Sequence, residues 1–459
     1  MARPDIKPPR TGREAALRAL RDVDVKEAYA NLALDHHLSG SRLEGRERAL
    51  ATELAYGVTR RRATLDWAIS QVATRPLEQM DPWIRNILRE AVYQLLYMDR
   101  IPPSAAVDQA VELAKQYGHV GVAKFVNGVL RSLLRKLPEL AWPDEATDPV
   151  RALAVRHSYP DWLVAEWRER FGAGETVRLL EAGNEVPPLT IRANRLKATR
   201  EQVAAALAEE GVQTEPTRHS PQGLIIKELT AAAHLDRLKA MKQGLFTVQD
   251  ESSMLVAAVV DPQPGWTVID LAAAPGGKST HLAELMQNQG RVIAIDIHPH
   301  KVELIEQNAA RLGIEIVQAV AMDARDVGRS MPDRADAVLC DVPCSGLGTL
   351  SRRADARWRK SPADIEALVP IQRAILESAA KAVKPGGVLV YSTCTIHPAE
   401  NQELVEGFIA EHPEFRFDDI WPHLPPSIPR EGQAEGYVQL LPHIHGTDGF
   451  FLCRMIRER

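Results

Sequence analysis

The chain is constrained most by one stretch, Ile269-Asp270-Leu271-Ala272-Ala273-Ala274-Pro275-Gly276-Gly277-Lys278. Residues 268–271 predict a short buried strand, and residues 279–286 predict a helix. The loop between them has small side chains and two glycines, so a ligand can approach the backbone closely. The free amides at the start of the helix favour a polar or anionic group.

A second apolar run, residues 292–295, ends at Asp296, about twenty residues beyond the glycines. An acid at this distance is where a nucleotide-type ligand finds a partner for its ribose hydroxyls. The two features together predict a doubly wound sheet that binds a nucleoside.

Two other interpretations of the glycine loop stay open at this point. Ala272 through Ser279 matches a phosphate-binding P-loop whose first glycine is missing. That glycine lets the loop wrap a phosphate, and Asp270 just upstream would repel one. The loop could also be a purely structural turn between a strand and a helix.

Length and composition indicate a globular protein of two or three domains, since the chain has 459 residues, 45% of them hydrophobic. We expect no membrane association, because no run of eighteen apolar residues occurs and the first residues lack the apolar core of a signal peptide. Four cysteines in so long a chain do not make a disulfide framework. A reducing, cytoplasmic location is therefore expected.

Charge is distributed unevenly along the chain. Residues 1–140 hold 22 Lys and Arg against 17 Asp and Glu, whereas the rest of the chain is acidic. A mildly basic first segment suits an RNA backbone, although the same charges could simply be solvated.

The first segment predicts an all-α bundle, because amphipathic helices fill residues 12 to about 137 without a β-rich interruption. Asp81-Pro82 marks a helix start, and a later helix carries an apolar stripe from Phe125 to Leu134. The cluster Arg60-Arg61-Arg62 and the basic face of the later helix could contact phosphate or be ordinary solvated charge.

Residues 137–149 read as a linker, and residues 150–245 predict a small α+β subdomain with a helix at 199–210 and short strands at 189–193, 224–227 and 245–248. Beyond it, residues 246–459 alternate strands and helices, which is typical of a mostly parallel sheet. The expected strands are 268–271, 292–295, 314–320, 337–340, 388–391 and 449–455. Gly386-Gly387 predicts a tight turn just before the strand at 388–391.

Polar residues follow the expected strands where a ligand would lie, at their carboxyl ends. They are the glycine loop, Asp296, Asp323, the run Asp341-Val342-Pro343-Cys344-Ser345-Gly346 and the run Ser392-Thr393-Cys394-Thr395. No His/Cys cluster has zinc spacing, so we expect no metal site.

Cys344 and Cys394 lie on two loops of this crevice, whereas Cys340 and Cys453 fall in apolar runs and read as small buried hydrophobes. A thiol is a natural nucleophile for a carbon that is electrophilic only through conjugation, such as C6 of a pyrimidine. Addition at C6 makes C5 nucleophilic toward a sulfonium methyl group. Loss of the C5 proton and of the thiol then restores aromaticity.

These motifs resemble the RNA cytosine-C5 methyltransferases that use S-adenosylmethionine, and the flanking phrases are similar to the RsmB/Sun (Fmu) branch. The resemblance rests on residues 272–278, on Asp341-x-Pro343-Cys344-Ser345-Gly346 and on Ser392-Thr393-Cys394. Residues 244–253, 125–131 and 447–451 carry the likeness to the RsmB/Sun branch, which methylates 16S ribosomal RNA.

The resemblance implies a role for each residue. Cys394 is the nucleophile and Cys344 assists release of the methylated base. Asp341 lies between cofactor and cytosine, and Lys278 orients it. Asp296 accepts the ribose hydroxyls and Asp323 reaches the adenine amine. The remaining cofactor contacts come from the loop, namely Ala272, Ala273, Ala274, Pro275, Gly276, Gly277 and Lys278.

Three positions depart from the family pattern. Ala272 stands where the family usually has cysteine, Val342 where it usually has alanine, and Lys301 replaces a more usual arginine. None removes a reacting group, but Val342 narrows the loop beside the base.

The resemblance thus implies a NusB-like all-helical RNA-binding domain (1–140), an RRM-like subdomain (150–245) and a Rossmann-like class I methyltransferase domain (246–459). We expect a monomeric enzyme that methylates 16S ribosomal RNA, either naked or in an assembling small subunit. A tRNA methyltransferase and an assembly factor with a degenerate nucleotide site are the alternatives.

Overall fold

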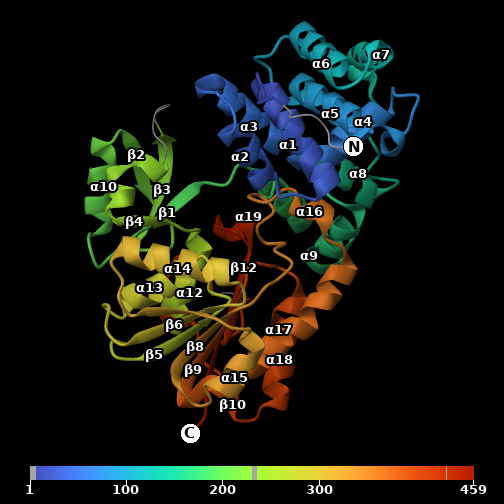
Figure 1. Cartoon of the computed structure of the whole chain (residues 1–459). Helices are drawn as coiled ribbons and strands as arrows, with labels where there is room; N and C mark the ends of the chain where they lie inside the picture. The colour runs from blue at the N-terminus through green and yellow to red at the C-terminus, as the bar shows by residue number, and fades with distance from the viewer. Residues whose placement is uncertain (1–6, 230–234, 431) are drawn as a thin grey trace. The chain divides into compact units, whose positions relative to one another are not determined.

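The computed structural model describes residues 7–229, 235–430 and 432–459 (Figure 1). The chain divides into two compact units. The first comprises described residues up to 185 together with the later segment 352–359, and the second comprises the other described residues from 186 to 459. Within the described ranges, every helix is too short or too polar to cross a membrane.

The first unit is helical in its described part, and residues 12–137 form the all-α bundle that the sequence predicted. Asp81 caps one helix by accepting a hydrogen bond of 2.8 Å from the Trp83 amide. The predicted apolar stripes form its core, with Ile87, Val126 and Leu130 almost fully buried. Its helices are α1 (Gly12–Lys26), α2 (Ala30–Ser39), α3 (Gly45–Arg60), α4 (Arg62–Ser70), α5 (Pro82–Tyr97), α6 (Pro103–Tyr117), α7 (Val120–Lys136), α8 (Pro149–His157), α9 (Asp161–Ala182) and α16 (Ala356–Arg359).

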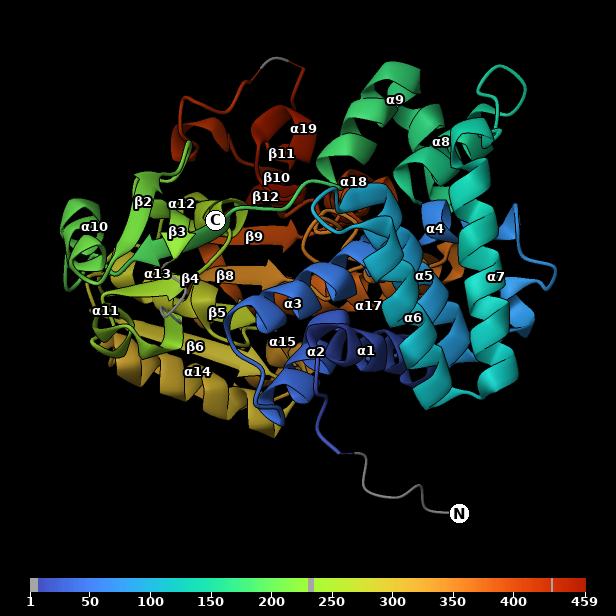
Figure 2. The same cartoon turned by 90° about the horizontal axis from the view of Figure 1, so that it is seen from above.

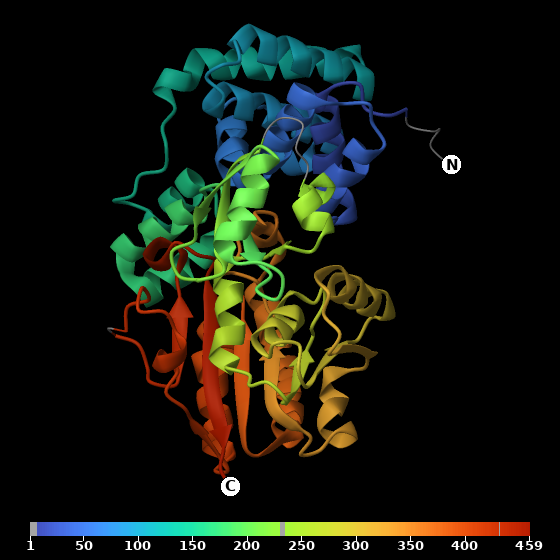
Figure 3. The ribbon, with the colours of Figure 1, turned by 90° about the vertical axis from the view of Figure 1, so that its left-hand side faces the viewer.

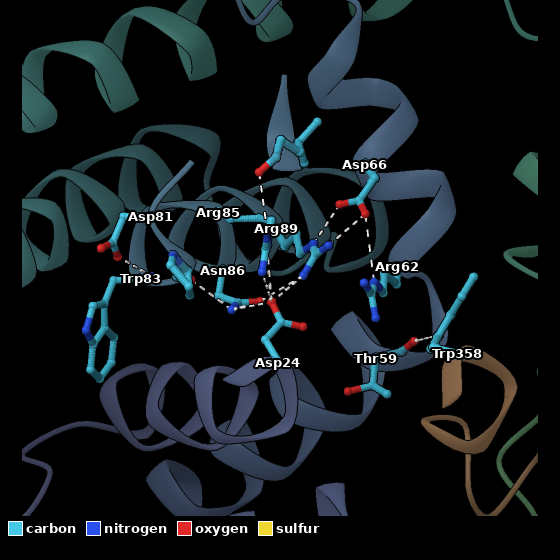
Figure 4. Close-up of polar contacts among 12 residues, drawn as sticks. Asp24, Thr59, Arg62, Asp66, Asp81, Trp83, Arg85, Asn86, Arg89 and Trp358 are labelled. Carbon is cyan, nitrogen blue, oxygen red and sulfur yellow. Dashed lines mark hydrogen bonds and ion pairs between the residues drawn. The ribbon is translucent and has the colours of Figure 1, made fainter. Parts of the chain in front are cut away.

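An ion-pair cluster joins α1, α4 and α5 (Figure 4). One oxygen of Asp24 accepts hydrogen bonds from Arg85 at 2.9 Å, Asn86 at 3.0 Å and Arg89 at 2.9 Å. Arg89 also donates to both oxygens of Asp66, at 2.6 and 2.7 Å. Because these charges are satisfied inside the bundle, they stabilise helix packing.

The basic cluster at residues 60–62 is likewise used inside this unit. Arg61 lies over the Tyr97 ring at 5.1 Å, and Arg62 lies over the Trp358 ring at 5.5 Å. Arg62 and its neighbour Arg61 are only partly exposed. Intramolecular contacts thus account for them better than either solvated charge or phosphate contact, the two roles that the sequence had suggested.

The segment 352–359 packs among the helices of the first unit, although the sequence places it within the third predicted domain. Arg357 is fully buried and donates to the carbonyl oxygens of Ser158 and Gly183, both at 3.0 Å. Its guanidinium lies 3.8 Å from the centre of the Tyr159 ring. The neighbouring Trp358 indole donates to the Thr59 carbonyl at 2.9 Å (Figure 4). The boundaries predicted for the three domains stay predictions.

The second unit begins with a small antiparallel sheet in the order β2-β3-β1-β4. The sequence predicted three of these strands and missed β2, an edge strand of which only Val212 is buried. Thr199 and Gln202 form a capping box at the start of the predicted helix. The elements are β1 (Leu189–Ala193), α10 (Arg200–Glu209), β2 (Val212–Pro216), β3 (Gly223–Leu229), α11 (Lys239–Lys242) and β4 (Phe246–Val248).

The larger sheet has the strand order β10-β12-β9-β8-β5-β6-β7, with β11 paired to β12. Figure 2 shows β12, β9, β8, β5 and β6 side by side in this order. The pairs from β9 to β7 are parallel, as predicted, and those of β12 are antiparallel. Its strands are β5 (Thr267–Leu271), β6 (Arg291–Asp296), β7 (Val317–Ala321), β8 (Ala335–Asp341), β9 (Val383–Thr393), β10 (Phe415–Phe417), β11 (Tyr437–Leu440) and β12 (Phe450–Arg457).

Two strand predictions were wrong in their bounds. The third strand begins at Val317 rather than residue 314, because the Ile314 amide donates to the Ala309 carbonyl at 2.9 Å and so still belongs to the end of the preceding helix. β9 begins at Val383, so the two glycines predicted as a turn before the strand lie inside it. A register shift between Ala335 and Ala337 on β8 accompanies this irregular start.

Helices cover both faces of the larger sheet (Figure 3). Alternate residues of the strands pack into two different hydrophobic cores. Val268 and Leu339 belong to one, and Ile269 and Cys340 belong to the other. The first core contains residues of α12 (Glu251–Val260), α13 (Gly277–Leu285) and α14 (Pro299–Leu312). The second contains residues of α15 (Val327–Ser330), α17 (Pro362–Ala382) and α18 (Gln402–Glu411).

Candidate active site

The strand register brings the predicted site residues to one edge of the sheet. Leu271 of β5 is paired with Ile295 of β6 and Cys340 of β8, and Cys340 with Tyr391 of β9. The next residue on each strand therefore falls on one row, which is Asp296, Ala272, Asp341 and Ser392. Strand order reverses between β5 and β8, and such a switch point is where open α/β sheets bind ligands.

The glycine loop joins β5 to α13 at this switch point. Gly276 has φ of +97°, a left-handed conformation that disfavours a side chain, and it occupies the N-cap of α13. A Cβ at Gly277 would meet nothing nearer than 3.8 Å. Among the residues that the structure describes, no side chain caps α13, so the loop offers free amides and open space to a polar ligand.

The two acids predicted for the nucleoside lie after neighbouring strands of this edge. Asp296 ends β6, and its Oδ1 accepts the His298 amide at 3.0 Å. Asp323 follows β7, and its carboxylate pairs with Arg325 at 2.6 Å. A carboxylate such as Asp296 fits the donor groups of a ribose diol.

Asp270, one residue before the end of β5, is fully buried and accepts a hydrogen bond from the Ser279 hydroxyl at 2.5 Å. Burial raises the pKa of Asp270 to about 7, and the charge of Asp341 adds to the rise. The native carboxyl therefore keeps its proton over a pH range in which the unfolded chain has released it.

We expect the stability of the second unit to fall as pH rises from about 4 to 7, and to level off above pH 7. The native state binds the extra proton in that window, so stability must decrease with pH there. The rise in pKa from 3.8 to about 7 corresponds to about 4 kcal/mol. Asp270→Asn should remove this dependence and be more stable than wild type at pH 8 by up to that amount. If the urea-unfolding midpoints of wild type and Asp270→Asn changed with pH in the same way from about pH 4 to 8, this expectation would be contradicted.

Asp341 is held from two sides at the end of β8. Lys278 donates to one carboxylate oxygen at 2.7 Å, and the Ser392 hydroxyl donates to the other at 2.7 Å. Burial lowers the pKa of Lys278, but the charge and hydrogen bond of Asp341 outweigh it, so the pKa is raised above its usual value. Lys278 is therefore a permanent cation that fixes the Asp341 carboxylate.

The two predicted thiols lie together, with 3.3 Å between the sulfurs of Cys344 and Cys394. Both cysteines are partly buried. The hydrogen bond to Cys394 and burial raise the pKa of the Cys344 thiol well above its usual value. The raised pKa favours the protonated form of Cys344, and either sulfur can donate the hydrogen bond between them.

A buried carboxylate, Glu400, joins the two cysteine loops and was missed in the sequence. It accepts the Ser345 amide at 2.8 Å and also the Ser345 hydroxyl, which lies 2.7 Å from the hydroxyl of Thr395. Gln372 donates to Glu400 at 2.8 Å and to the Pro343 carbonyl at 3.0 Å. Glu400 and Gln372 lie outside any motif, and only their contacts single them out.

Glu400→Ala should destabilise the second unit by about 3 kcal/mol. Its removal leaves the Ser345 amide without its buried acceptor and takes one acceptor each from the Ser345 hydroxyl and the Gln372 amide. Urea unfolding measures the loss. The matched control is Glu403→Ala, an exposed residue on α18, which should change stability by less than about 0.5 kcal/mol. Equal effects of the two substitutions would show that Glu400 does not support the loops.

The remaining cysteines, Cys340 and Cys453, are fully buried in the sheet, as predicted. Among the described residues, no group of three His, Cys, Asp or Glu side chains is arranged to hold a metal ion.

Family models match three stretches of the chain. The profile of the family "16S rRNA methyltransferase RsmB/F" matches residues 257–456, and that of the NusB family matches residues 10–135. A ferredoxin-like domain described as Methyltr_RsmF/B-like matches residues 159–232.

Three relatives support these matches. The probable ribosomal RNA small subunit methyltransferase B of Bacillus subtilis (strain 168) is 41% identical over 97% of this chain and 98% of its own. The crystal structure of PH0851 has a TM-score of 0.81 at 30% identity, covering 99% of this chain and 100% of that chain. The crystal structure of NSun6 from Pyrococcus horikoshii with SFG has a TM-score of 0.58 at 26% identity, covering 66% of this chain and 99% of that chain.

Proposed function

Because the chain belongs to the RsmB/F family of S-adenosylmethionine-dependent small-subunit ribosomal RNA methyltransferases, we propose that it methylates C5 of one cytosine in 16S ribosomal RNA. The reaction proceeds by covalent addition of the Cys394 sulfur to C6 of the base. The observation that carries the proposal is the 3.3 Å separation of the Cys394 and Cys344 sulfurs at the edge of the sheet.

Cys394 is the better nucleophile of the pair. Cys344 keeps its proton, because its hydrogen bond to Cys394 and its burial raise its pKa. Attack requires the thiolate, so the raised pKa of Cys344 disfavours this thiol as the attacking group. Either sulfur can donate the hydrogen bond between them, and the family resemblance assigns the attack to Cys394.

The Cys394 sulfur, as a thiolate, bonds to C6, the electron pair of the C5–C6 double bond moves toward C5, and N3 takes a proton from solvent that it gives back when the ring is restored. S-adenosylmethionine would supply an electrophilic methyl group, which C5 takes as the bond from that methyl to the sulfonium sulfur breaks and its electron pair stays on the sulfur. The C5 proton then leaves to a base, and the bond between sulfur and C6 breaks, which restores the aromatic ring. Cys344, whose sulfur lies 3.3 Å from that of Cys394, assists this last departure.

We assign the polar edge of the cytosine, with its exocyclic amine, to Asp341, which Lys278 positions. A carboxylate accepts a hydrogen bond from an exocyclic amine, and the Asp341 oxygens are fixed by Lys278 and Ser392 at 2.7 Å each. A carboxylate fixed in this way is preorganised for the base and needs no rearrangement during the reaction. Lys278 acts through Asp341 and is a positioning residue.

The methyl donor fits the neighbouring loop. We assign its methionine part and ribose to residues 272–278, where α13 presents free amides and Gly276 and Gly277 leave room. Asp296 accepts the ribose hydroxyls, and Asp323 reaches the adenine amine. A triphosphate fits less well, because the loop has Ala272 at the first glycine position of a P-loop and buried Asp270 beneath it.

The target cytosine must be unpaired or flipped out of its helix, because both of its faces have to be reached. Extrusion costs a few kcal/mol, and the cost is smallest for a loop nucleotide. We therefore propose a loop or junction cytosine, on either naked 16S ribosomal RNA or an assembling particle, and action as a monomer in the cytoplasm.

Bisulfite sequencing of ribosomal and transfer RNA from a strain that lacks the gene tests the proposal. One cytosine of 16S ribosomal RNA should lose its protection and regain it with the wild-type gene, but not with the Cys394→Ala gene. Loss of protection in a tRNA would favour the tRNA alternative. Unchanged protection at every cytosine would leave only an assembly factor without turnover.

A further inference from the structure

Strand β1 of the small antiparallel sheet has two faces with different partners. Ile191 and Ala193 are buried in the core of the small sheet. Arg192 and Asn194, which directly follows the strand, alternate with these residues and are also buried, but they contact helices that pack on the larger sheet. Asn194 donates to the Leu312 carbonyl at the end of α14, at 2.8 Å. Arg192 reaches the beginning of α13, where the glycine loop ends.

The guanidinium of Arg192 donates hydrogen bonds to both the first and the last turn of α13. One nitrogen donates to the Gly277 carbonyl at 2.8 Å and to the side-chain oxygen of Gln249. The other donates to Glu284 at 2.7 Å and to the Thr280 hydroxyl at 3.2 Å. The side chains of Arg192 and Glu284 are both completely buried. This pair thus connects the small sheet to the helix that follows the cofactor loop.

We propose that Arg192 is a positioning residue for the methyl donor. This inference rests on the proposed assignment of residues 272–278 to S-adenosylmethionine. The Gly277 carbonyl belongs to the same peptide group as the Lys278 amide, so the bond from Arg192 fixes the orientation of that amide. It also fixes the start of the Lys278 side chain, which holds Asp341. Gly276 and Gly277 have no side chains of their own to restrain the loop, and Arg192 supplies the restraint from another subdomain.

A buried arginine elsewhere in the second unit separates positioning from mere stability. Arg454 of β12 pairs with Asp418 at 2.7 Å and donates to the Val260 carbonyl at the end of α12 at 3.0 Å. It is 7% exposed, so it resembles Arg192 in burial, charge pairing and attachment to a helix terminus. It contacts a different helix from the one that follows the cofactor loop.

The test compares Arg192→Lys with Arg454→Lys in the full chain. Lysine keeps the charge opposite the carboxylate but lacks the planar fork. Arg192→Lys should raise the Kd for S-adenosylmethionine in calorimetry, and its KM, by about 10-fold or more, leaving the KM for RNA unchanged. Arg454→Lys should lower the melting temperature about as much as Arg192→Lys does, but leave the Kd for S-adenosylmethionine within about twofold of the wild-type value. An unchanged Kd for folded Arg192→Lys, or equal shifts for both variants, would overturn the inference.

Two further variants complete the design. If Arg192→Lys does not fold, Gln249→Met replaces it, since it removes one partner of the guanidinium while keeping the ion pair with Glu284; it should raise the Kd in the same direction, and an unchanged Kd would overturn the inference. Asp296→Ala tests the proposed cofactor site itself. Lost binding in Asp296→Ala with normal binding in the Arg192 variant would overturn the positioning role alone. Normal binding in Asp296→Ala would instead overturn the cofactor assignment.

Discussion

Replacing Cys394 with alanine should abolish methyl transfer, with a fall in kcat of at least about 10⁴-fold, while S-adenosylmethionine still binds. The methyl group can be accepted only after a thiolate has added to C6, and the raised pKa of the neighbouring Cys344 thiol disfavours it as a substitute. Transfer of labelled methyl groups to 16S ribosomal RNA measures activity, and calorimetry measures cofactor binding.

Cys453→Ala is the matched control for this substitution. Cys453 is a fully buried thiol of β12, and its strand pairs with the strand that leads to Cys394. It should lose some stability but keep its activity. Turnover of Cys394→Ala at the wild-type rate would contradict the covalent mechanism. Loss of both activity and cofactor binding would mean that the substitution disturbed the fold.

Replacing Cys344 with alanine should trap a covalent complex between enzyme and RNA. Addition at C6 and methylation at C5 need only Cys394, whereas the departure of its sulfur is assisted by the Cys344 thiol at 3.3 Å. The adduct should therefore accumulate in the presence of S-adenosylmethionine and migrate slowly in a denaturing gel. Its amount should approach one RNA per protein.

The double variant, Cys344→Ala with Cys394→Ala, is the control for this adduct, because it lacks the attacking sulfur. It should form no slowly migrating species. Absence of an adduct in the single variant, together with normal turnover, would contradict the division of labour between the two thiols. An adduct that persists in the double variant would place the bond on another residue.

Much of the architecture follows from local patterns. The apolar stripe around Ile87 predicted a core helix, and Asp81 before Pro82 predicted its start, because helical periodicity and capping are encoded within a few residues. The two thiols and Asp341 could be placed together for a similar reason, since carboxyl ends of parallel strands share one edge. Their separations and partners were settled only by the register of the strands.

Residues that act over long sequence distances left no such pattern. Arg192 binds Glu284 ninety-two positions later, and Arg357 is buried against residues more than 170 positions earlier. Glu400 reads as an ordinary charged residue until its contact with Ser345 is known. A buried charge is recognised by its partner, and the partner is fixed by the tertiary fold. The short edge strand β10, with three residues, is likewise below what periodicity detects.

Release of tritium from 16S ribosomal RNA labelled at C5 of its cytosines tests the central claim most directly. Methylation at C5 must expel the hydrogen that was there. The account predicts S-adenosylmethionine-dependent release, equal in amount to the methyl groups incorporated and absent with Cys394→Ala. Methyl incorporation without tritium release would contradict it, because the methyl group would then have gone to another atom.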